Sequence, residues 1–142
     1  MDTEPDYLLV RGMHSSIRLN LQHYLWKDGL GYLIHPSIPL PRPDSRIADL
    51  GTGTGIWLLD LASQLPATTQ LYGFDIFPSQ YPHAAHLPPN ITLSVLDNLQ
   101  PEPPKDLQGT FDIVHLRLWL GVVPNGDPIA LLTHALKLLR RK

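Results

Sequence analysis

An acid followed by three alternating glycines, "DLGTGTG" from Asp49 to Gly55, is the segment of the sequence best suited to hold a small polar ligand. Glycines between a strand and a helix let the backbone approach a ligand closely, so that N–H groups can meet a carboxylate. Asp49 can accept hydrogen bonds from an ammonium group, or it can brace the loop itself. An amino-acid-like moiety carries both charges, and the pattern favours such a ligand.

Two other glycine loops fit this segment less well. A phosphate-binding P-loop has a lysine and then serine or threonine after its glycines, whereas this loop runs into Ile56 and Trp57. The dinucleotide fingerprint places its third glycine three positions after the second, and Ile56 occupies that position here. An NAD-dependent oxidoreductase is therefore a disfavoured alternative.

Polar residues also end the next two apolar segments. Asp75 ends "LYGFD", where a carboxylate is well placed to accept both hydroxyl groups of a ribose. Asp97 and Asn98 end "LSVLDN", where an acceptor can receive the exocyclic amine of adenine. Carboxylate, ammonium, ribose and adenine together describe S-adenosylmethionine. Thr52 and Ile76, which adjoin these residues, are included in the predicted cofactor site.

Histidines offer less specific signals. His115, at the end of "TFDIVHL", is the only histidine that we expect near the cofactor, either as a packed residue or as a reacting one. His83 and His86 have a spacing that suits a metal, but no third ligand is evident, and a surface loop is the favoured interpretation. The sequence has no cysteine and predicts no metal site. It indicates no general base.

The elements that must position these residues alternate between strand and helix. Hydrophobic periodicity predicts strands at 47–50, 70–76, 91–97 and 110–116 and a helix over 56–65, with proline-rich connections between them. A last helix over 127–142 begins with Asp127 as its cap and Pro128 at its first position. Strands separated by crossovers favour a parallel sheet of the α/β class.

An N-terminal helix precedes this alternation. Ser15 or Ser16 is a suitable cap, glycines at 29 and 31 end the helix, and the helix is expected to lie on the main sheet. Its apolar residues at helical spacing are Ile17, Leu21, Tyr24 and Leu25. Residues 1–45 are thus predicted to be a helical segment with a proline-rich linker, and residues 46–142 a cofactor-binding domain.

Length and composition set the broader limits. A chain of 142 residues with 43% hydrophobic residues and a net charge of -2 is typical of one soluble globular domain and does not favour nucleic acid. The acidic N-terminus does not resemble a secretory signal, and no apolar run approaches the roughly 20 residues of a membrane span. A cytoplasmic protein without a membrane partner is the expectation.

The segments "IADLGTGTGIW", "LYGFDIFPSQYP", "LPPNITLSVLDN", "FDIVHLRLWLGVV" and "NGDPIALLTHALKLL" resemble, in this order, the class I S-adenosylmethionine-dependent methyltransferases of fungal secondary metabolism. The resemblance implies a Rossmann-like fold and methyl transfer to a small-molecule acceptor. It implies that the glycines line the methionine end, Asp75 the ribose, and Asp97 with Asn98 the adenine, although the family often has a second acid in place of Asn98. "RLNLQH" at 18–23 resembles the helix that helps to close over the cofactor.

The sequence also differs from the family that it resembles. Family members continue through a Pro-Gly-Gly turn into three further strands, whereas this sequence ends at "KLLRRK". It therefore implies the N-terminal half of the fold, with about four strands and an unpaired edge on the fourth that can recruit a second copy or a protein partner. The final helix is expected to cover part of this surface through Ile129, Leu132, Leu136 and Leu139. A truncated, non-catalytic module is the alternative function.

Overall fold

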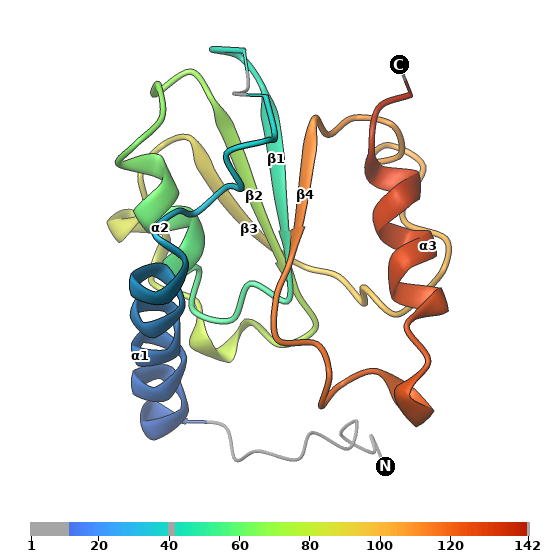
Figure 1. Ribbon diagram of the computed structural model, residues 1–142, viewed down its shortest axis with the longest axis horizontal. Coiled ribbons are helices and arrows are strands. Elements are labelled where there is room, and N and C mark those ends of the chain that lie inside the picture. The colour runs from blue at the N-terminus through green and yellow to red at the C-terminus, as the bar shows by residue number, and fades with distance from the viewer. Residues whose placement is uncertain (1–11, 40–41, 142) are drawn as a thin grey trace.

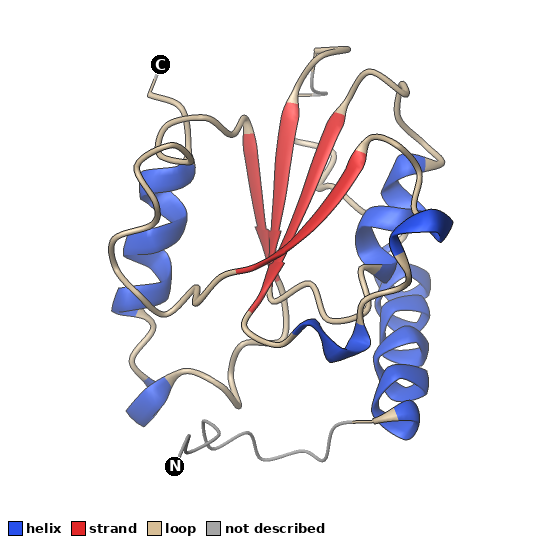
Figure 2. Cartoon of the chain, turned by 180° about the vertical axis from the view of Figure 1, so that it is seen from behind, coloured by secondary structure: helices blue, strands red, loops and turns tan. Residues whose placement is uncertain are grey.

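A computed structural model describes residues 12–39 and 42–141 of the chain. Its centre is a parallel sheet with the strand order β3-β2-β1-β4 (Figures 1 and 2). The four strands are β1 (Arg46–Leu50), β2 (Gln70–Asp75), β3 (Ile91–Val95) and β4 (Ile113–Leu116). The predicted α/β class, the parallel sheet and its four strands are confirmed.

The sheet has helices on both faces. α1 (Met13–Leu30) and α2 (Ile56–Ala62) lie on one face, and α3 (Ile129–Leu138) lies on the other (Figure 1). Two short 3-10 turns, η1 (Pro78–Gln80) and η2 (Ala84–His86), make up the proline-rich connection from β2 to β3, and a third, η3 (Pro124–Gly126), precedes α3. No helix in the described parts of the chain is long and apolar enough to cross a membrane.

β1 is buried because both of its faces are covered. Ile47 points into a core shared with α2, which contributes Trp57, Leu58 and Leu61. Ala48 and Leu50 point the other way, into a core shared with α3. This two-sided burial explains why residues 47–50 of β1 are apolar apart from Asp49.

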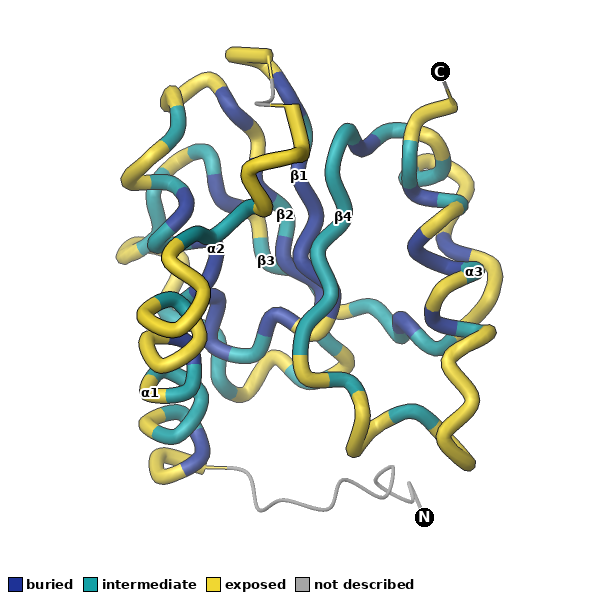
Figure 3. The backbone as a smooth tube through the Cα atoms, in the orientation of Figure 1, coloured by how far each residue is buried: buried dark blue, intermediate teal, exposed yellow. Residues whose placement is uncertain are grey.

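α1 differs from its predicted form. The helix begins at Met13 after Gly12, and neither Ser15 nor Ser16 caps it. Its predicted apolar face is exposed to solvent (Figure 3): the exposed fractions of Ile17, Leu21, Tyr24 and Leu25 lie between 52% and 63%. The helix packs instead against α2 and the glycine loop, largely through polar contacts that hydrophobic periodicity cannot detect.

α3 is also shorter than predicted and turned about its axis. It begins at Ile129, whose N–H donates to the Asp127 carboxylate over 2.9 Å. The predicted stripe is wrong, since Ile129, Leu132 and Leu136 are exposed. The buried face consists of Leu131, His134, Ala135 and Leu138. α3 is apolar around most of its circumference, so its sequence offered two competing stripes.

β4 is an edge strand among the described residues. It pairs with β1 on one side, and the only further contact of this kind is a parallel bridge between Phe111 and Leu139. Around this bridge the Phe111 N–H donates to the Leu138 carbonyl, and the Arg140 N–H donates to the Phe111 carbonyl. The chain therefore returns from α3 to the start of β4.

Candidate functional site

The glycine loop joins β1 to α2 at the carboxyl end of the sheet. Gly51, Gly53 and Gly55 have φ angles of 71°, 60° and 77°, which favour glycine over any other residue. Their N–H groups donate to the Phe74 carbonyl, the Asp75 carboxylate and the Thr52 carbonyl, respectively. All three glycine N–H groups thus donate within the protein, and contact of the loop with a ligand carboxylate stays a prediction.

Asp75 lies against this loop, and its role in binding a ribose stays a prediction. Its Oδ2 atom accepts the Gly53 N–H over 2.9 Å, and its Oδ1 atom accepts the Phe77 N–H over 3.3 Å. A carboxylate has about four acceptor positions, so it can accept further hydroxyl groups. Ile76, the next residue, is 38% exposed. Burial and the nearby charge of Asp75 raise the pKa of Tyr81, which keeps that hydroxyl protonated.

Asp97 and Asn98 face different surroundings. Asp97 accepts hydrogen bonds from the Leu99 N–H and from the side chain of Gln100. Asn98 is buried, and its amide nitrogen donates to the Phe74 carbonyl over 3.3 Å. Its Oδ1 atom has no partner among the described residues, and the same holds for the buried Oγ1 atom of Thr52. The site thus contains buried acceptor capacity next to the glycine loop and β3.

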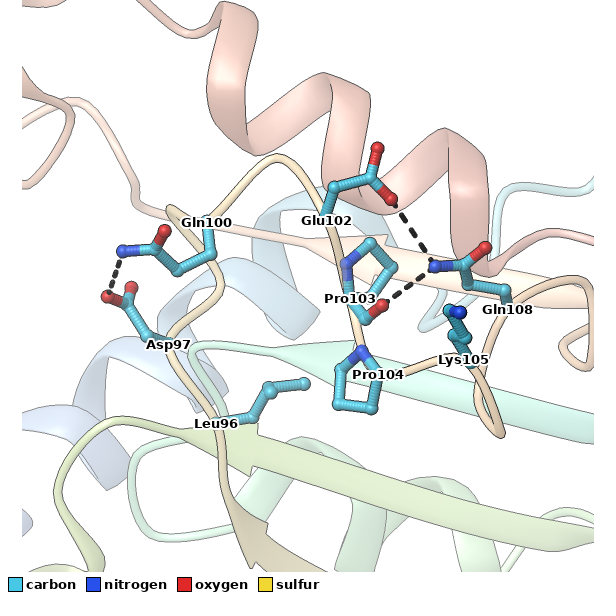
Figure 4. Close-up of a pocket in the computed structure, with 8 residues that line it drawn as sticks. All are labelled: Leu96, Asp97, Gln100, Glu102, Pro103, Pro104, Lys105 and Gln108. Atoms are coloured by element: carbon cyan, nitrogen blue, oxygen red, sulfur yellow. Dashed lines mark hydrogen bonds between the residues drawn. The ribbon is translucent and has the colours of Figure 1, made fainter.

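A hollow of about 630 Å³ adjoins Asp97 on the segment between β3 and β4 (Figure 4). Two prolines and two glutamines contribute to its wall, and Gln108 donates to Glu102 and to the Pro103 carbonyl. Neither the glycine loop nor Asp75 lines this hollow. Asp97 is the member of the predicted site that opens onto it.

Asp49 and His115 form a direct pair. The two residues are neighbours in the β1–β4 register, and His115 Nδ1 lies 2.7 Å from Asp49 Oδ1. The Trp57 ring stacks on the His115 ring at 3.8 Å with an interplanar angle of 2°. Asp49 is only 4% exposed, so this imidazole satisfies a buried carboxylate and fixes its position.

A second network of polar side-chain contacts, which was not predicted, links α1, α2 and the end of β4. Buried His23 contacts Asp60 through Nε2 over 2.7 Å and Arg117 through Nδ1 over 3.2 Å. Because a guanidinium can only donate, Nδ1 must accept, and His23 is neutral with its proton on Nε2. Lys27 also binds Asp60. His23 lies in the "RLNLQH" segment, but its partners are 37 and 94 residues away.

α1 also covers the glycine loop. The Thr54 hydroxyl donates to the Asn20 side chain over 2.7 Å. A Cβ atom added at Gly53 would lie 3.1 Å from a methyl group of Leu19. The helix therefore closes over the loop, in agreement with the resemblance of its "RLNLQH" segment.

Trp119 covers the same loop from the β4 side. Its indole N–H donates to the Leu50 carbonyl, and its ring would lie 2.8 Å from a Cβ atom added at Gly51. Leu118, just before it, has a φ of 62°, an uncommon conformation for a residue other than glycine. Trp57 is a buried core residue, whereas Trp119 is half-buried and packs both against the core on the α3 side of the sheet and over the glycine loop.

His83 and His86 lie in the β2–β3 connection, as the surface-loop interpretation requires. Both are exposed, and His83 Nδ1 accepts the Ala85 N–H. Within residues 12–39 and 42–141, no three histidine and acidic side chains are grouped so that they could hold a metal ion.

Comparisons with known proteins identify the family of this chain. Residues 20–142 match the family described as "Methyltransferase domain". The N-methyltransferase tcpN of Claviceps purpurea is 46% identical over 111 residues, which cover 78% of this chain and 39% of that protein. The N-methyltransferase gliN of Aspergillus fumigatus is 37% identical, over 87% of this chain and 42% of that protein. The chain thus spans about two fifths of the length of these relatives.

Solved structures show the same fold. A putative S-adenosylmethionine-dependent methyltransferase from Methanococcus maripaludis matches 99% of this chain and 63% of its own, with a TM-score of 0.65 and 11% identity. A putative methyltransferase in complex with the Trm112 activator of Haloferax volcanii matches 93% and 57%, with a TM-score of 0.63 and 19% identity. The fold is the Rossmann-like fold of class I S-adenosylmethionine-dependent methyltransferases, and the chain belongs to the methyltransferase domain family.

Proposed function

We propose that this chain binds S-adenosylmethionine and forms the cofactor-binding part of an enzyme that methylates a small molecule. The observation that carries the proposal is the hydrogen bond from the Gly53 N–H to Asp75, since it places an acid at the end of β2 beside the glycine loop. The match of residues 20–142 to the methyltransferase domain supports the same assignment.

The residues present fit this cofactor. Asp75 can accept the two ribose hydroxyl groups, and the unpartnered buried Oδ1 atom of Asn98 is an acceptor suited to an amine N–H. Asp97, at the mouth of the adjoining hollow, is a second acceptor for the adenine end. Asp49, held by His115, supplies a negative charge for the ammonium group. His115 then acts by positioning Asp49.

The cofactor supplies a sulfonium whose methyl group is already a good electrophile. The residues of this chain have to align that group and exclude water. α1 does this through Asn20 and Leu19, which cover the glycine loop, and Trp119 covers Gly51 from the opposite side. A base is needed only where the acceptor is a weak nucleophile, and no residue is assigned to that role.

The acceptor is proposed to be a small secondary metabolite. The fungal relatives tcpN and gliN are both named N-methyltransferases, which supports nitrogen as the methylated atom. A non-catalytic module that acts through cofactor or partner binding is the second candidate.

Calorimetric titration with S-adenosylhomocysteine tests the proposal. We expect saturable binding with one site per chain and no comparable binding of NAD. Methyl transfer to candidate metabolites is assayed separately. Binding without turnover would favour the non-catalytic module, while preferential binding of NAD or absence of any binding would reject the cofactor assignment.

We also propose that β4 mediates association with a second copy or a protein partner. β4 is the edge strand of the described sheet, and edge strands with free backbone groups recruit other strands. Size-exclusion chromatography with light scattering, over a hundredfold range of protein concentration, should show a mass that rises with concentration. A constant monomer mass would contradict self-association.

A further inference from the structure

The amino-acid end of the proposed cofactor needs a partner for each of its two charges. Asp49 is proposed for the ammonium group through the acceptor positions that its bond to His115 leaves, and the carboxylate was expected to meet the glycine N–H groups. The N–H groups of Gly51, Gly53 and Gly55 all donate within the protein. A cation at the same end of the sheet is a further donor that a ligand carboxylate can use, and its bond would be charge-assisted.

Arg117 is such a cation. It follows β4 directly, it is half-buried, and no carboxylate among the described residues lies within ion-pair distance of its side chain. Its hydrogen-bond partner is the neutral ring of His23, which accepts through Nδ1 over 3.2 Å. A neutral acceptor orients the guanidinium without neutralising its charge.

The carboxylates nearby are engaged elsewhere. Asp60 binds His23 and Lys27, so its charge is matched by the lysine. Asp49 binds His115. Burial lowers the pKa of Arg117, while the charge of Asp49 opposes this effect, and an arginine stays charged at neutral pH in either case.

Arg117 and Asp49 lie on the same face of the sheet. Asp49 pairs in register with His115, and Arg117 is two residues further along the chain, where side-chain alternation returns to the same face. The stacking of Trp57 on His115 and the contact of Arg117 with His23 identify this face as the one that α1 and α2 cover. Two opposite charges held apart on one face are complementary to a zwitterion.

We propose that Arg117 binds the α-carboxylate of the amino-acid moiety of the cofactor, with Asp49 as the partner of its ammonium group and His23 as the residue that positions Arg117. This inference rests on the proposed function and deepens it. It predicts that the chain selects cofactor-like ligands that carry a complete amino-acid group.

The test measures the binding of three ligands by calorimetry: S-adenosylhomocysteine, its decarboxylated analogue, and 5′-methylthioadenosine, which lacks the whole amino-acid end. The native chain should bind S-adenosylhomocysteine about 10- to 100-fold more tightly than the decarboxylated analogue, as expected for a charge-assisted hydrogen bond. R117M should remove this preference and leave the affinity for 5′-methylthioadenosine unchanged. R117K should keep part of this preference, because the positive charge remains but the planar guanidinium, which can donate two parallel hydrogen bonds to a carboxylate, is lost.

Two further arginine variants serve as comparisons. Arg140 binds Asp112 away from the loop, so R140M should behave like the native chain. Arg18 lies on α1 and donates to Ser15, and R18M tests whether a different arginine binds the carboxylate. Circular dichroism checks that each variant is folded. If R117M does not fold, the inference is judged from two measurements: the preference of R117K, and the preference of the native chain for S-adenosylhomocysteine over the decarboxylated analogue.

The outcomes separate the two proposals. Absence of binding by all three ligands would overturn the proposed function and this inference with it. Binding of S-adenosylhomocysteine with no preference over the decarboxylated analogue would overturn the inference alone. The same conclusion follows if R117M or R117K keeps the full preference, or if R18M loses it while the Arg117 variants do not.

Discussion

His115 and Asp49 are direct neighbours across the β1–β4 pair, with the imidazole Nδ1 atom 2.7 Å from a carboxylate oxygen. The Asp49 side chain is 6% exposed and that of His115 20%. A buried carboxylate that loses its donor is costly, so the two residues depend on each other.

H115A should therefore destabilise the chain by about 2 to 3 kcal/mol, because it leaves Asp49 without this donor and removes the ring that stacks on Trp57. Urea unfolding measures the change. H86A, at an exposed position in the β2–β3 connection, is the matched control and should change the free energy of unfolding by less than about 0.5 kcal/mol. Equal effects of the two substitutions would show that the Asp49–His115 pair does not stabilise the fold.

Asp75 should control cofactor affinity. D75A removes the acceptor of the Gly53 N–H and the predicted acceptor of the ribose hydroxyl groups, and we expect S-adenosylhomocysteine to bind more weakly by about 2 to 4 kcal/mol. Calorimetry on the folded variant checks this. D44A, at an exposed carboxylate before β1, should bind normally. Native affinity of D75A would remove Asp75 from the site.

Gly51 should not tolerate a side chain. G51A places a methyl group 2.8 Å from the Trp119 ring at a φ of 71°, so it adds crowding to backbone strain. G109A is the matched control, since Gly109 has a φ of 66° but open space around the added atom. We expect G51A to destabilise the chain by about 1 to 2 kcal/mol more than G109A. The indole emission of Trp119 should also shift to longer wavelength.

Urea unfolding and fluorescence test this pair of variants, and W119F identifies the signal of that indole. Equal destabilisation by both alanines, with unchanged emission, would mean that backbone strain alone accounts for the effect and that Trp119 does not close over the loop.

His134 should make stability depend on pH. Its ring is buried in α3, Nδ1 binds the Gln100 carbonyl over 2.6 Å, and burial lowers the pKa of the imidazole. The unfolded chain, with an ordinary histidine pKa near 6.5, then binds the proton more readily than the folded chain. The contribution of His134 is complete above that pKa and is lost as the pH falls below it.

Between pH 7.5 and pH 5.5 the native chain should therefore lose more unfolding free energy than H134N, in which the side-chain amide can still donate to Gln100. The limiting slope for one group is about 1.4 kcal/mol per pH unit. H86N, at the exposed position, should keep the native pH dependence. Parallel pH profiles for the native chain and H134N would contradict this assignment.

Local patterns in the sequence predicted the sheet and the loop well. The strands are short apolar runs between glycine and proline signals, and β1, β2 and β3 begin within a residue of where these runs begin. The glycines at 51, 53 and 55 predicted the loop correctly, because each of these positions has a positive φ angle, which favours glycine. The position of Asp75 beside the loop was predictable because β2 ends at Asp75, and the carboxyl ends of parallel strands lie at the same edge of the sheet.

The orientation of the outer helices was not predictable in the same way. Apolar residues on α1 and α3 suggested faces that are exposed, since the contacts of α1 are made by polar residues such as His23 and Asn20. A hydrogen bond between a histidine and an aspartate 37 residues away leaves no periodic signal in the sequence.

The contacts that form the site join residues at very different separations along the sequence. The contact between Gly53 and Asp75 spans 22 residues, whereas the contacts of His115 with Asp49 and of Arg117 with His23 span 66 and 94. Longer loops cost more entropy to close, so the β1–β2 half is expected to form early in folding and the β4 contacts late. Native-state hydrogen exchange should then find the amides of β4 less protected than those of β1 and β2. In such a protein the Asp49–His115 and Arg117–His23 contacts would be the first part of the site to loosen, while the Gly53–Asp75 contact stays ordered.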